Sequence, residues 1–198
     1  MDKQELINIL DESLYEKIEL QDIPEIDLYM DQVIQLFESK LSDSKRNKED
    51  KVLTKTMINN YAKAKLLMSV KNKKYSKEHL ILMSLIYELK GALSINDIKS
   101  LLSTIVNKFE AGEEYDLRGL YEKYLEEDNK DNELILKAVK DKIENINEVS
   151  FEEKFLLISS VISMSNIYRK IGELLIDKYF NEEEDENEES KWFKKRIN

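Results

Sequence analysis

The chain has 198 residues, of which 41% are hydrophobic, so it is long enough to bury one sizeable core. Its four glycines and one proline exclude a β-sandwich or a collagen-like chain and favour long helices. The absence of cysteine excludes disulfides and thiolate metal sites. The single histidine argues against a catalytic triad or a multi-histidine metal site. We therefore expect a mainly helical, non-enzymatic protein without a cofactor, whose function lies in a binding surface.

The charge is unevenly distributed along the chain. The formal net charge is −10, but residues 40–77 hold twelve basic and three acidic residues, which gives this window a charge of +9. The remaining 160 residues therefore carry −19. Because contact electrostatics act within about 8–10 Å, a basic window on an acidic protein can bind a polyanion locally. The alternative is that the lysine-rich segments only keep the protein soluble.

The sequence predicts neither a targeting segment nor a membrane segment. The first five residues, Met1 to Glu5, include three charged side chains and lack the apolar stretch of a signal peptide. No stretch approaches the roughly 20 apolar residues of a membrane span. Because a chain without cysteine fits a reducing compartment, we expect a cytoplasmic protein with no membrane partner.

Two helices are predicted before the basic window. Leucine or isoleucine recurs at every fourth position from Leu6 to Ile18, which predicts a helix over residues 2–20. Pro24 interrupts this pattern and can occupy the first turn of a second helix, which continues to about Leu41. Residues 42–51 are polar and charged, so we expect a connection that contributes nothing to the core.

The basic window and the residues after it predict three further helices and a lysine-rich segment. The first of these helices begins at Thr54 or Thr56 and ends near residue 67. Residues 68–74 have no helical period and form either a tight hairpin or an open loop. Serine is a favoured residue at the N-terminal cap of a helix, so helices are expected directly after Ser76 and Ser94.

Gly112 and Gly119 flank a tyrosine-rich connection over residues 115–124, and two helical stretches follow it. They cover about residues 132–145 and about residues 150–180. In the second stretch, apolar residues recur at alternating steps of four and three, as in a coiled-coil seam. The seam residues are Leu157, Val161, Met164, Tyr168, Ile171 and Leu175. This pattern predicts either a dimerisation seam or an ordinary core helix of a bundle.

The last residues form an acidic segment followed by a short basic and aromatic one. Seven of the ten residues from 181 to 190 are acidic, so this segment cannot form a core and is expected to be flexible. It either serves solubility or folds back onto the basic window and competes with a bound polyanion. The predicted organisation is an N-terminal helix (1–20), a binding unit (21–110), a helical packing or dimerisation region (111–180) and an acidic tail (181–198).

The order of the predicted elements in residues 21–110 is that of a winged helix-turn-helix unit. In such a unit, lysines and small polar residues on one helix enter the major groove of double-stranded DNA. Lysines on a projecting hairpin contact the flanking phosphates. The candidates for the groove are Lys55, Thr56, Asn59, Asn60 and Lys63, and the candidates for the DNA backbone are Tyr61, Lys71, Lys73 and Lys74.

Several segments carry a family resemblance: Tyr61, Leu66-Leu67, Lys74-Tyr75-Ser76 and the run Leu-Ser-Ile-Asn-Asp-Ile-Lys-Ser-Leu-Leu at residues 93–102. Through them, residues 56–102 resemble the DNA-binding region of the MerR-type winged-helix regulators. Asn59 stands where that family has arginine, and Lys65 stands where it has glycine. The resemblance implies a transcriptional regulator that binds DNA as a homodimer through its long C-terminal helix, with an effector that the sequence does not identify.

A longer run, from Ile23-Pro24 through residues 55–61 to Lys73-Ser76, is similar to an uncharacterised bacterial family. This family is the domain of unknown function 1836, and the similarity covers most of residues 20–125. It implies a fold rather than a function. We therefore expect a sequence-specific DNA-binding regulator. The alternative is a protein-interaction adaptor that reuses the winged-helix scaffold without binding DNA.

Overall fold

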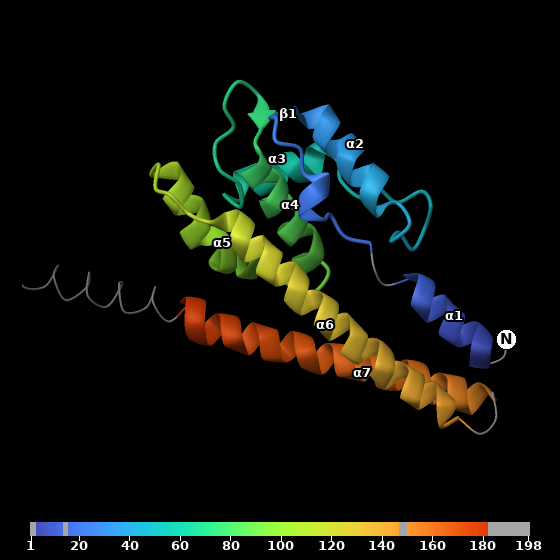
Figure 1. The fold of residues 1–198 in the computed structure, drawn as a ribbon. Coiled ribbons are helices and arrows are strands. Elements are labelled where there is room, and N and C mark those ends of the chain that lie inside the picture. The colour runs from blue at the N-terminus through green and yellow to red at the C-terminus, as the bar shows by residue number, and fades with distance from the viewer. Residues whose placement is uncertain (1–2, 14–15, 147–149, 182–198) are drawn as a thin grey trace, which may run out of the picture.

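The structure is a computed structural model that describes residues 3–13, 16–146 and 150–181 (Figure 1). The predicted acidic tail therefore lies outside the described residues, apart from its first residue. Within the described residues, the chain forms seven α-helices, two short helical turns and one two-stranded antiparallel sheet. This architecture confirms the predicted mainly helical fold with at most a short hairpin.

The elements have the following bounds. The α-helices are α1 (Lys3–Ser13), α2 (Met30–Leu41), α3 (Lys55–Lys63), α4 (Lys77–Leu89), α5 (Ile95–Glu110), α6 (Leu117–Glu144) and α7 (Phe151–Ile176). The other elements are the 3-10 turn η1 (Leu20–Asp22), the strands β1 (Leu28–Tyr29) and β2 (Lys74–Tyr75), and the π-helical turn η2 (Asp177–Asn181). Strand β1 pairs with β2, so that Leu28 lies opposite Tyr75 and Tyr29 lies opposite Lys74.

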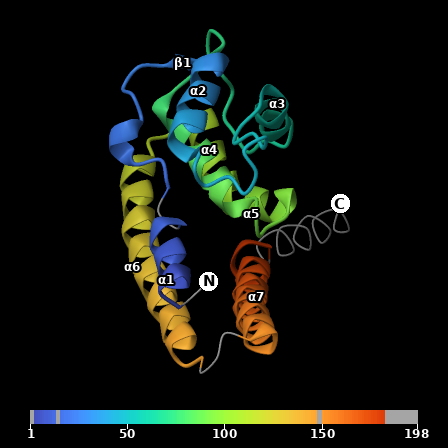
Figure 2. The same ribbon diagram turned by 90° about the vertical axis from the view of Figure 1, so that its right-hand side faces the viewer.

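Helix α4 is the centre of the hydrophobic core. All of its residues from His79 to Ile86 are buried, as expected for a helix whose apolar residues surround its axis. Helices α2, α3, α5 and the first half of α6 contribute buried side chains to the same core, for example Phe37, Ile58 and Leu102. Figure 2 shows α4 behind α2, with α6 and α5 beside it. The predicted starts of α4 and α5, directly after Ser76 and Ser94, are confirmed.

The N-terminal helix is shorter than the sequence predicts. Helix α1 ends at Ser13, and residues 16–19 are irregular rather than helical. Ile18 is buried in the core, and its carbonyl oxygen accepts a 2.6 Å hydrogen bond from the Tyr121 hydroxyl. Lys17 forms an ion pair with Asp128 of α6. These contacts with α6 replace the hydrogen bonds that a longer helix would make.

The second helix also begins later than predicted. Pro24 does not open it, because α2 begins at Met30 and the residues between them make contacts with other elements. The carboxylate of Glu25 pairs with Lys77 at 3.1 Å and with Arg118 at 2.8 Å. Residues 28 and 29 then form β1. Pairing with distant segments therefore outweighs the local preference for a helix.

Helix α6 includes much of the tyrosine-rich segment that the sequence placed in a connection. The carboxylate of Asp116 caps the helix by accepting a 2.9 Å hydrogen bond from the Gly119 N–H. A Cβ at Gly119 would collide with that carboxylate, so the glycine permits the cap. Burial of Tyr121 and Leu125 then holds the first half of α6 against the core. Gly119 thus belongs to the start of α6 rather than to a loop.

The second half of α6 and helix α7 form an antiparallel pair that extends away from the core (Figures 1 and 2). Near their connection, Lys142 Nζ donates a 2.9 Å hydrogen bond to Ser160 Oγ. The opposite end of α7, together with η2, contacts α5. Helix α1 packs along α6, where Lys3 Nζ donates a 2.9 Å hydrogen bond to the carbonyl oxygen of Glu144.

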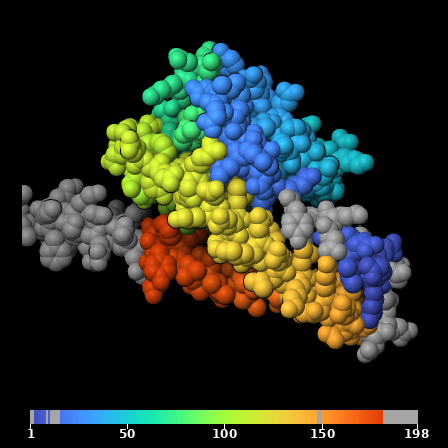
Figure 3. All heavy atoms as spheres, in the orientation of Figure 1, coloured from blue at the N-terminus to red at the C-terminus, as the bar shows by residue number. Residues whose placement is uncertain are grey.

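Helix α7 leaves most of its apolar side chains exposed. In the predicted seam, the first three residues are half-buried, whereas Tyr168, Ile171 and Leu175 are 66%, 48% and 48% exposed. Outside the seam, Phe155 and Ile158 are 59% and 63% exposed. Figure 3 shows α7 along the outer edge of the molecule. No helix of the described ranges combines the length and the hydropathy that a membrane crossing requires.

Candidate nucleic-acid interface

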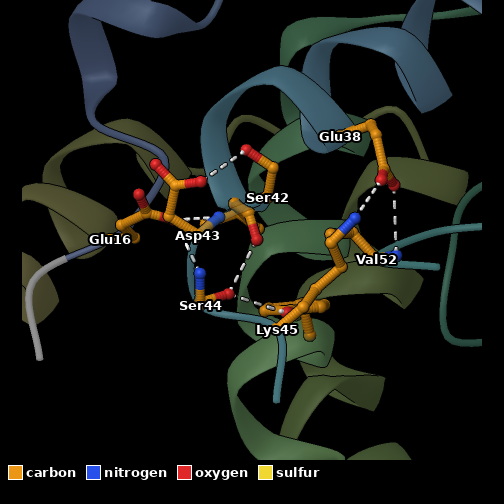
Figure 4. A network of polar contacts seen from close by, with 9 residues as sticks. Glu16, Glu38, Ser42, Asp43, Ser44, Lys45 and Val52 are labelled. Atoms are coloured by element: carbon orange, nitrogen blue, oxygen red, sulfur yellow. Dashed lines mark hydrogen bonds and ion pairs between the residues drawn. The ribbon is translucent and has the colours of Figure 1, made fainter. Parts of the chain in front are cut away.

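The connection between α2 and α3 is held in place by two carboxylates (Figure 4). Glu16 accepts 2.9 Å hydrogen bonds from two successive backbone N–H groups just after α2. Glu38 accepts hydrogen bonds from Lys45 Nζ at 2.5 Å and from the Val52 N–H at 3.3 Å. The bond from Lys45 holds the pKa of Glu38 below its usual value. This long connection therefore has defined contacts, which fix the start of α3 relative to α2.

Helix α3 begins at the predicted cap. The Thr54 side chain accepts a 3.1 Å hydrogen bond from the Met57 N–H, and the backbone of Thr54 is extended, with φ −130°. Such a cap satisfies one of the free N–H groups of the first turn. Ile58 and Tyr61 are buried and hold the inner side of the helix against the core. The opposite side of α3 is therefore exposed.

Five of the predicted residues lie on this exposed side of α3, namely Lys55, Thr56, Asn59, Asn60 and Lys63. The four-residue spacing from Lys55 to Asn59 to Lys63 places them in one stripe along the helix. Lysines in such a stripe can contact phosphates, and amide side chains can hydrogen-bond to base edges. Lys55 pairs with Asp31 at 2.8 Å, and both side chains are exposed, so this weak ion pair can exchange for a phosphate.

A left-handed residue ends α3. The Leu66 N–H donates a 2.9 Å hydrogen bond to the carbonyl oxygen of Tyr61, and Lys65 between them has φ 60°. This geometry is a Schellman motif, in which glycine is the usual left-handed residue. The lysine at this position places a further exposed amine beside α3. Lys65 was not among the interface residues predicted from the sequence. It lies in the run 51–77, whose eight lysines and lack of acidic residues could have pointed to it.

The lysine-rich segment forms a tight hairpin rather than an open loop. The Lys74 N–H donates a 2.9 Å hydrogen bond to the Lys71 carbonyl oxygen, and the two residues between them have φ 52° and 60°. Positive φ at both central residues defines a type I′ turn, and Lys71 and Lys74 form an isolated antiparallel bridge across it. Lys71 and Lys73 are exposed. Lys74 is half-buried, with its Nζ 5.2 Å from the centre of the Tyr29 ring.

The turn yields a prediction with opposite effects on stability and binding. We expect Lys73→Gly to raise the free energy of unfolding by about 0.5–1 kcal/mol, because glycine adopts a positive φ without steric strain. In a complex with DNA through the hairpin, the lost charge should weaken binding. Lys71→Gly is the matched control, since it removes the same charge at a position without positive φ and should destabilise the protein. Urea denaturation measures the free energy of unfolding of both variants, and equal changes in this free energy would contradict the prediction.

Two side chains hold the segment that leads into the turn. His79 Nδ1 accepts a 3.2 Å hydrogen bond from the Ser76 N–H, so the neutral ring carries its proton on Nε2 and donates to the Met68 carbonyl oxygen at 3.1 Å. Glu110, the last residue of α5, accepts a hydrogen bond from the Ser69 N–H. This bond holds the pKa of Glu110 below its usual value. The hairpin is therefore anchored to both α4 and α5.

The buried His79 predicts a pH dependence of stability. Burial lowers the pKa of His79 below its usual value of 6.5, although the Met68 carbonyl and nearby carboxylates of Glu78, Asp27 and Glu110 oppose this change. The unfolded chain therefore binds the proton more readily than the folded chain does. The contribution of His79 to stability is complete above about pH 6.5 and is lost as the pH falls, by at most about 1.4 kcal/mol per pH unit.

Chemical denaturation between about pH 5 and 8 measures this effect as the difference between the wild-type chain and His79→Gln. The comparison needs both proteins, because burial raises the pKa of Glu88, and this group changes stability in the opposite direction. The wild-type chain should lose stability toward acid relative to the variant. Parallel curves for the two proteins would show that the pKa of His79 is the same in the folded and the unfolded chain, which contradicts the prediction.

The end of α3 and the base of the hairpin are neighbours in space. Both border a hollow of about 680 Å³, whose walls include Asn59 and Lys65 from the α3 side, Val70 from the hairpin, and Glu110 from α5. Both ribbon views also show α3 beside the chain that leads to β2 (Figures 1 and 2). We use the name lysine surface for the exposed side chains of Lys55, Lys63, Lys65, Lys71 and Lys73. Within the described part of the chain, Lys55 is the only one of these five with an ion pair.

Tyr61 differs from the other predicted interface residues. Its side chain is only 5% exposed, and burial raises the pKa of its hydroxyl. The ring packs in the core on the inner side of α3, which the sequence analysis did not anticipate when it assigned Tyr61 to the DNA backbone. We therefore leave Tyr61 out of the candidate interface.

These features define a mainly helical protein with an exposed polar helix and a basic hairpin. Residues 18–124 match the family described as a domain of unknown function (DUF1836). The match covers more than half of the chain, from the buried Ile18 to the first half of α6, and includes the lysine surface. The chain belongs to this family. No curated protein and no solved structure matches the chain significantly.

Proposed function

We propose that this protein is a sequence-specific DNA-binding transcriptional regulator of MerR-like type and that it catalyses no reaction. The observation that carries this proposal is the lysine surface, in which Lys55 and Lys63 lie on α3 before and after the exposed amides of Asn59 and Asn60. In the proposed complex, α3 enters the major groove and these amides read base edges. Lys71 and Lys73 on the hairpin contact the flanking phosphates.

The charge distribution favours a polyanion on this side of the molecule. Residues 51–77 form α3, the hairpin and their connection, and they contain eight lysines and no acid. The rest of the chain carries a formal charge of −18. Such a charge pattern attracts DNA to one side and repels it from the others. Binding should therefore depend steeply on salt.

The local geometry supports the proposed likeness to the MerR-type regulators. The order α2, connection, α3, hairpin, α4 and α5 follows the winged helix-turn-helix order that the sequence resemblance implies. Lys65 has a left-handed backbone at the position where that family has glycine. The tight turn between Lys71 and Lys74 supplies the wing. These agreements concern backbone geometry, which the residue types alone do not specify.

We also propose that the protein is a homodimer through α7. The first half of the predicted seam faces α6 within the same chain, since Leu157 and Ser160 border the contact with Lys142. The remaining seam residues and the side that holds Phe151, Phe155, Ile158 and Ile162 are exposed. A stable interface needs about 800 Å² on each partner, and these four side chains, which share one side of the helix, supply part of that area.

The charges of α7 favour a second copy in the antiparallel direction. Residues 155–168 carry no charge, whereas Glu152, Glu153 and Lys154 precede them with a net charge of −1, and Arg169 and Lys170 follow them. An antiparallel copy places the acidic start of one α7 beside the basic residues of the other, and a parallel copy does not. Two lysine surfaces related by a two-fold axis would then meet two half-sites on DNA.

The test is a selection of genomic DNA fragments from the source organism on the immobilised full-length protein, at about 0.1 M salt. The variant Lys55→Ala/Asn59→Ala/Lys63→Ala, with folding checked by circular dichroism, serves as the comparison. We expect a shared, roughly palindromic sequence that is enriched by the wild-type protein and lost in the variant. Equal recovery by both proteins would contradict DNA recognition through α3 and would favour a protein-interaction adaptor.

A further inference from the structure

We propose that the acidic segment 182–189 binds the lysine surface of its own chain and thereby competes with DNA. The competition with DNA rests on the proposed function, whereas the contact between the two segments does not. The segment has the sequence Glu-Glu-Glu-Asp-Glu-Asn-Glu-Glu and lies outside the described residues, so only its composition and its attachment point enter the argument. It is a regulatory partner for the same surface.

The charges of the two segments are complementary. Seven of the eight residues in segment 182–189 are acidic, and they carry negative charges along a chain as nucleic-acid phosphates do. Within the described residues, Lys63, Lys65, Lys71 and Lys73 form no ion pair, so their amines are available to a carboxylate. A cluster of opposite charges on one chain interacts at a high effective concentration, which compensates for the weakness of each exposed ion pair.

The attachment point lies within reach of the lysine surface. The turn η2 directly precedes the acidic segment and contacts α5, as the ribbon views also show (Figures 1 and 2). Helix α5 has 16 residues and is about 24 Å long. Its last residue, Glu110, binds the Ser69 N–H at the base of the hairpin. An extended segment of eight residues spans up to about 26–29 Å, so it can follow α5 to the hairpin.

The only tryptophan of the chain, Trp192, follows the acidic segment and reports on it without a label. In the full-length protein without DNA, we expect the fluorescence anisotropy of Trp192 to fall as salt rises from about 0.02 to 0.3 M, because salt screens the contact. The change should be absent in Lys63→Ala/Lys71→Ala/Lys73→Ala. An anisotropy change that persists in the lysine variant would overturn the proposal.

The competition with DNA is measured with a full-length variant that carries Asp185→Asn, Glu186→Gln, Glu188→Gln and Glu189→Gln, the acids farthest from the attachment point. At about 0.05 M salt it should bind a random-sequence duplex about tenfold more tightly than the wild-type protein, and this advantage should vanish at about 0.3 M. The matched control carries four exposed substitutions elsewhere: Glu114→Gln, Glu122→Gln, Glu126→Gln and Glu133→Gln. Equal gains for both variants would attribute the effect to net charge and overturn the competition.

The two measurements separate this inference from the proposed function. If Trp192 reports the salt-sensitive, lysine-dependent contact and no variant binds DNA, the contact between the segments stands and DNA recognition fails. If the wild-type protein binds DNA while the four tail substitutions change neither the anisotropy of Trp192 nor the affinity for DNA, DNA recognition stands and the proposed competition fails.

Discussion

The triple variant Lys63→Ala/Lys71→Ala/Lys73→Ala should bind double-stranded DNA about 500-fold more weakly than the wild-type protein at 0.1 M salt. Each phosphate that a lysine neutralises contributes about 0.9 to the slope of log affinity against log salt. The loss of three such contacts should lower the slope by about 3 and should weaken all DNA sequences alike. Titration of a duplex of about 30 base pairs at several salt concentrations measures both quantities.

A matched control separates the position of these lysines from the net charge. Lys99→Ala/Lys123→Ala/Lys137→Ala removes the same charge from exposed sites outside residues 51–77 and should leave the salt slope nearly unchanged. Asn59→Ala should instead relax the sequence preference and leave the slope intact, because amide contacts to bases release no counterions. If the control and the triple variant lose affinity equally, DNA is not bound through the lysine surface.

The elements that the sequence predicts well are those set by local chemistry. Ser94 and Asp97 form the predicted capping box, with hydrogen bonds of 3.2 and 3.1 Å in the two directions, and α5 begins directly after Ser94. Ser150 likewise caps α7 by accepting a hydrogen bond from the Glu153 N–H. A cap needs only residues that lie three positions apart, so the sequence contains the whole interaction.

The elements that the sequence predicts poorly are set by contacts between distant residues. Ile18 continues the apolar pattern of α1, but its burial against α6 and its bond to Tyr121 leave it outside the helix. Tyr29 and Lys74 pair in a sheet of two strands with two residues each, and no run of β-forming residues predicts these strands. In both cases the helical or irregular preference of a few residues is weaker than the tertiary contact.

The sequence predicts which residues the candidate interface contains, but it does not predict the contacts that hold the interface in place. The spacing of Lys55, Asn59 and Lys63 requires only that α3 be a helix, so its exposed stripe follows from the sequence. The anchoring of the hairpin by His79 and Glu110 does not follow, because His79 lies 11 positions from its partner Met68 and Glu110 lies 41 positions from its partner Ser69. Tyr61 was assigned to the wrong side of α3, since an aromatic residue in a polar helix fits either side until the core is known.

The variant Ile158→Glu/Ile162→Glu should convert the protein from a dimer to a monomer. The two side chains are 63% and 55% exposed in the single chain, so the substitutions should not disturb its fold. In the proposed dimer they would place unpaired carboxylates inside an apolar contact, which should raise the dissociation constant at least about 100-fold. Sedimentation equilibrium should therefore report 23.4 kDa for the variant and twice that mass for the wild-type protein.

The control replaces two exposed isoleucines outside α7, as Ile26→Glu/Ile95→Glu, and should remain a dimer. The monomeric variant should keep its helical content, and it should also bind DNA more weakly, because one lysine surface reaches only one half-site. If the wild-type protein is itself a monomer, the proposed dimer through α7 is wrong. A variant that stays a dimer would place the interface on the exposed half of the predicted seam, at Tyr168, Ile171 and Leu175.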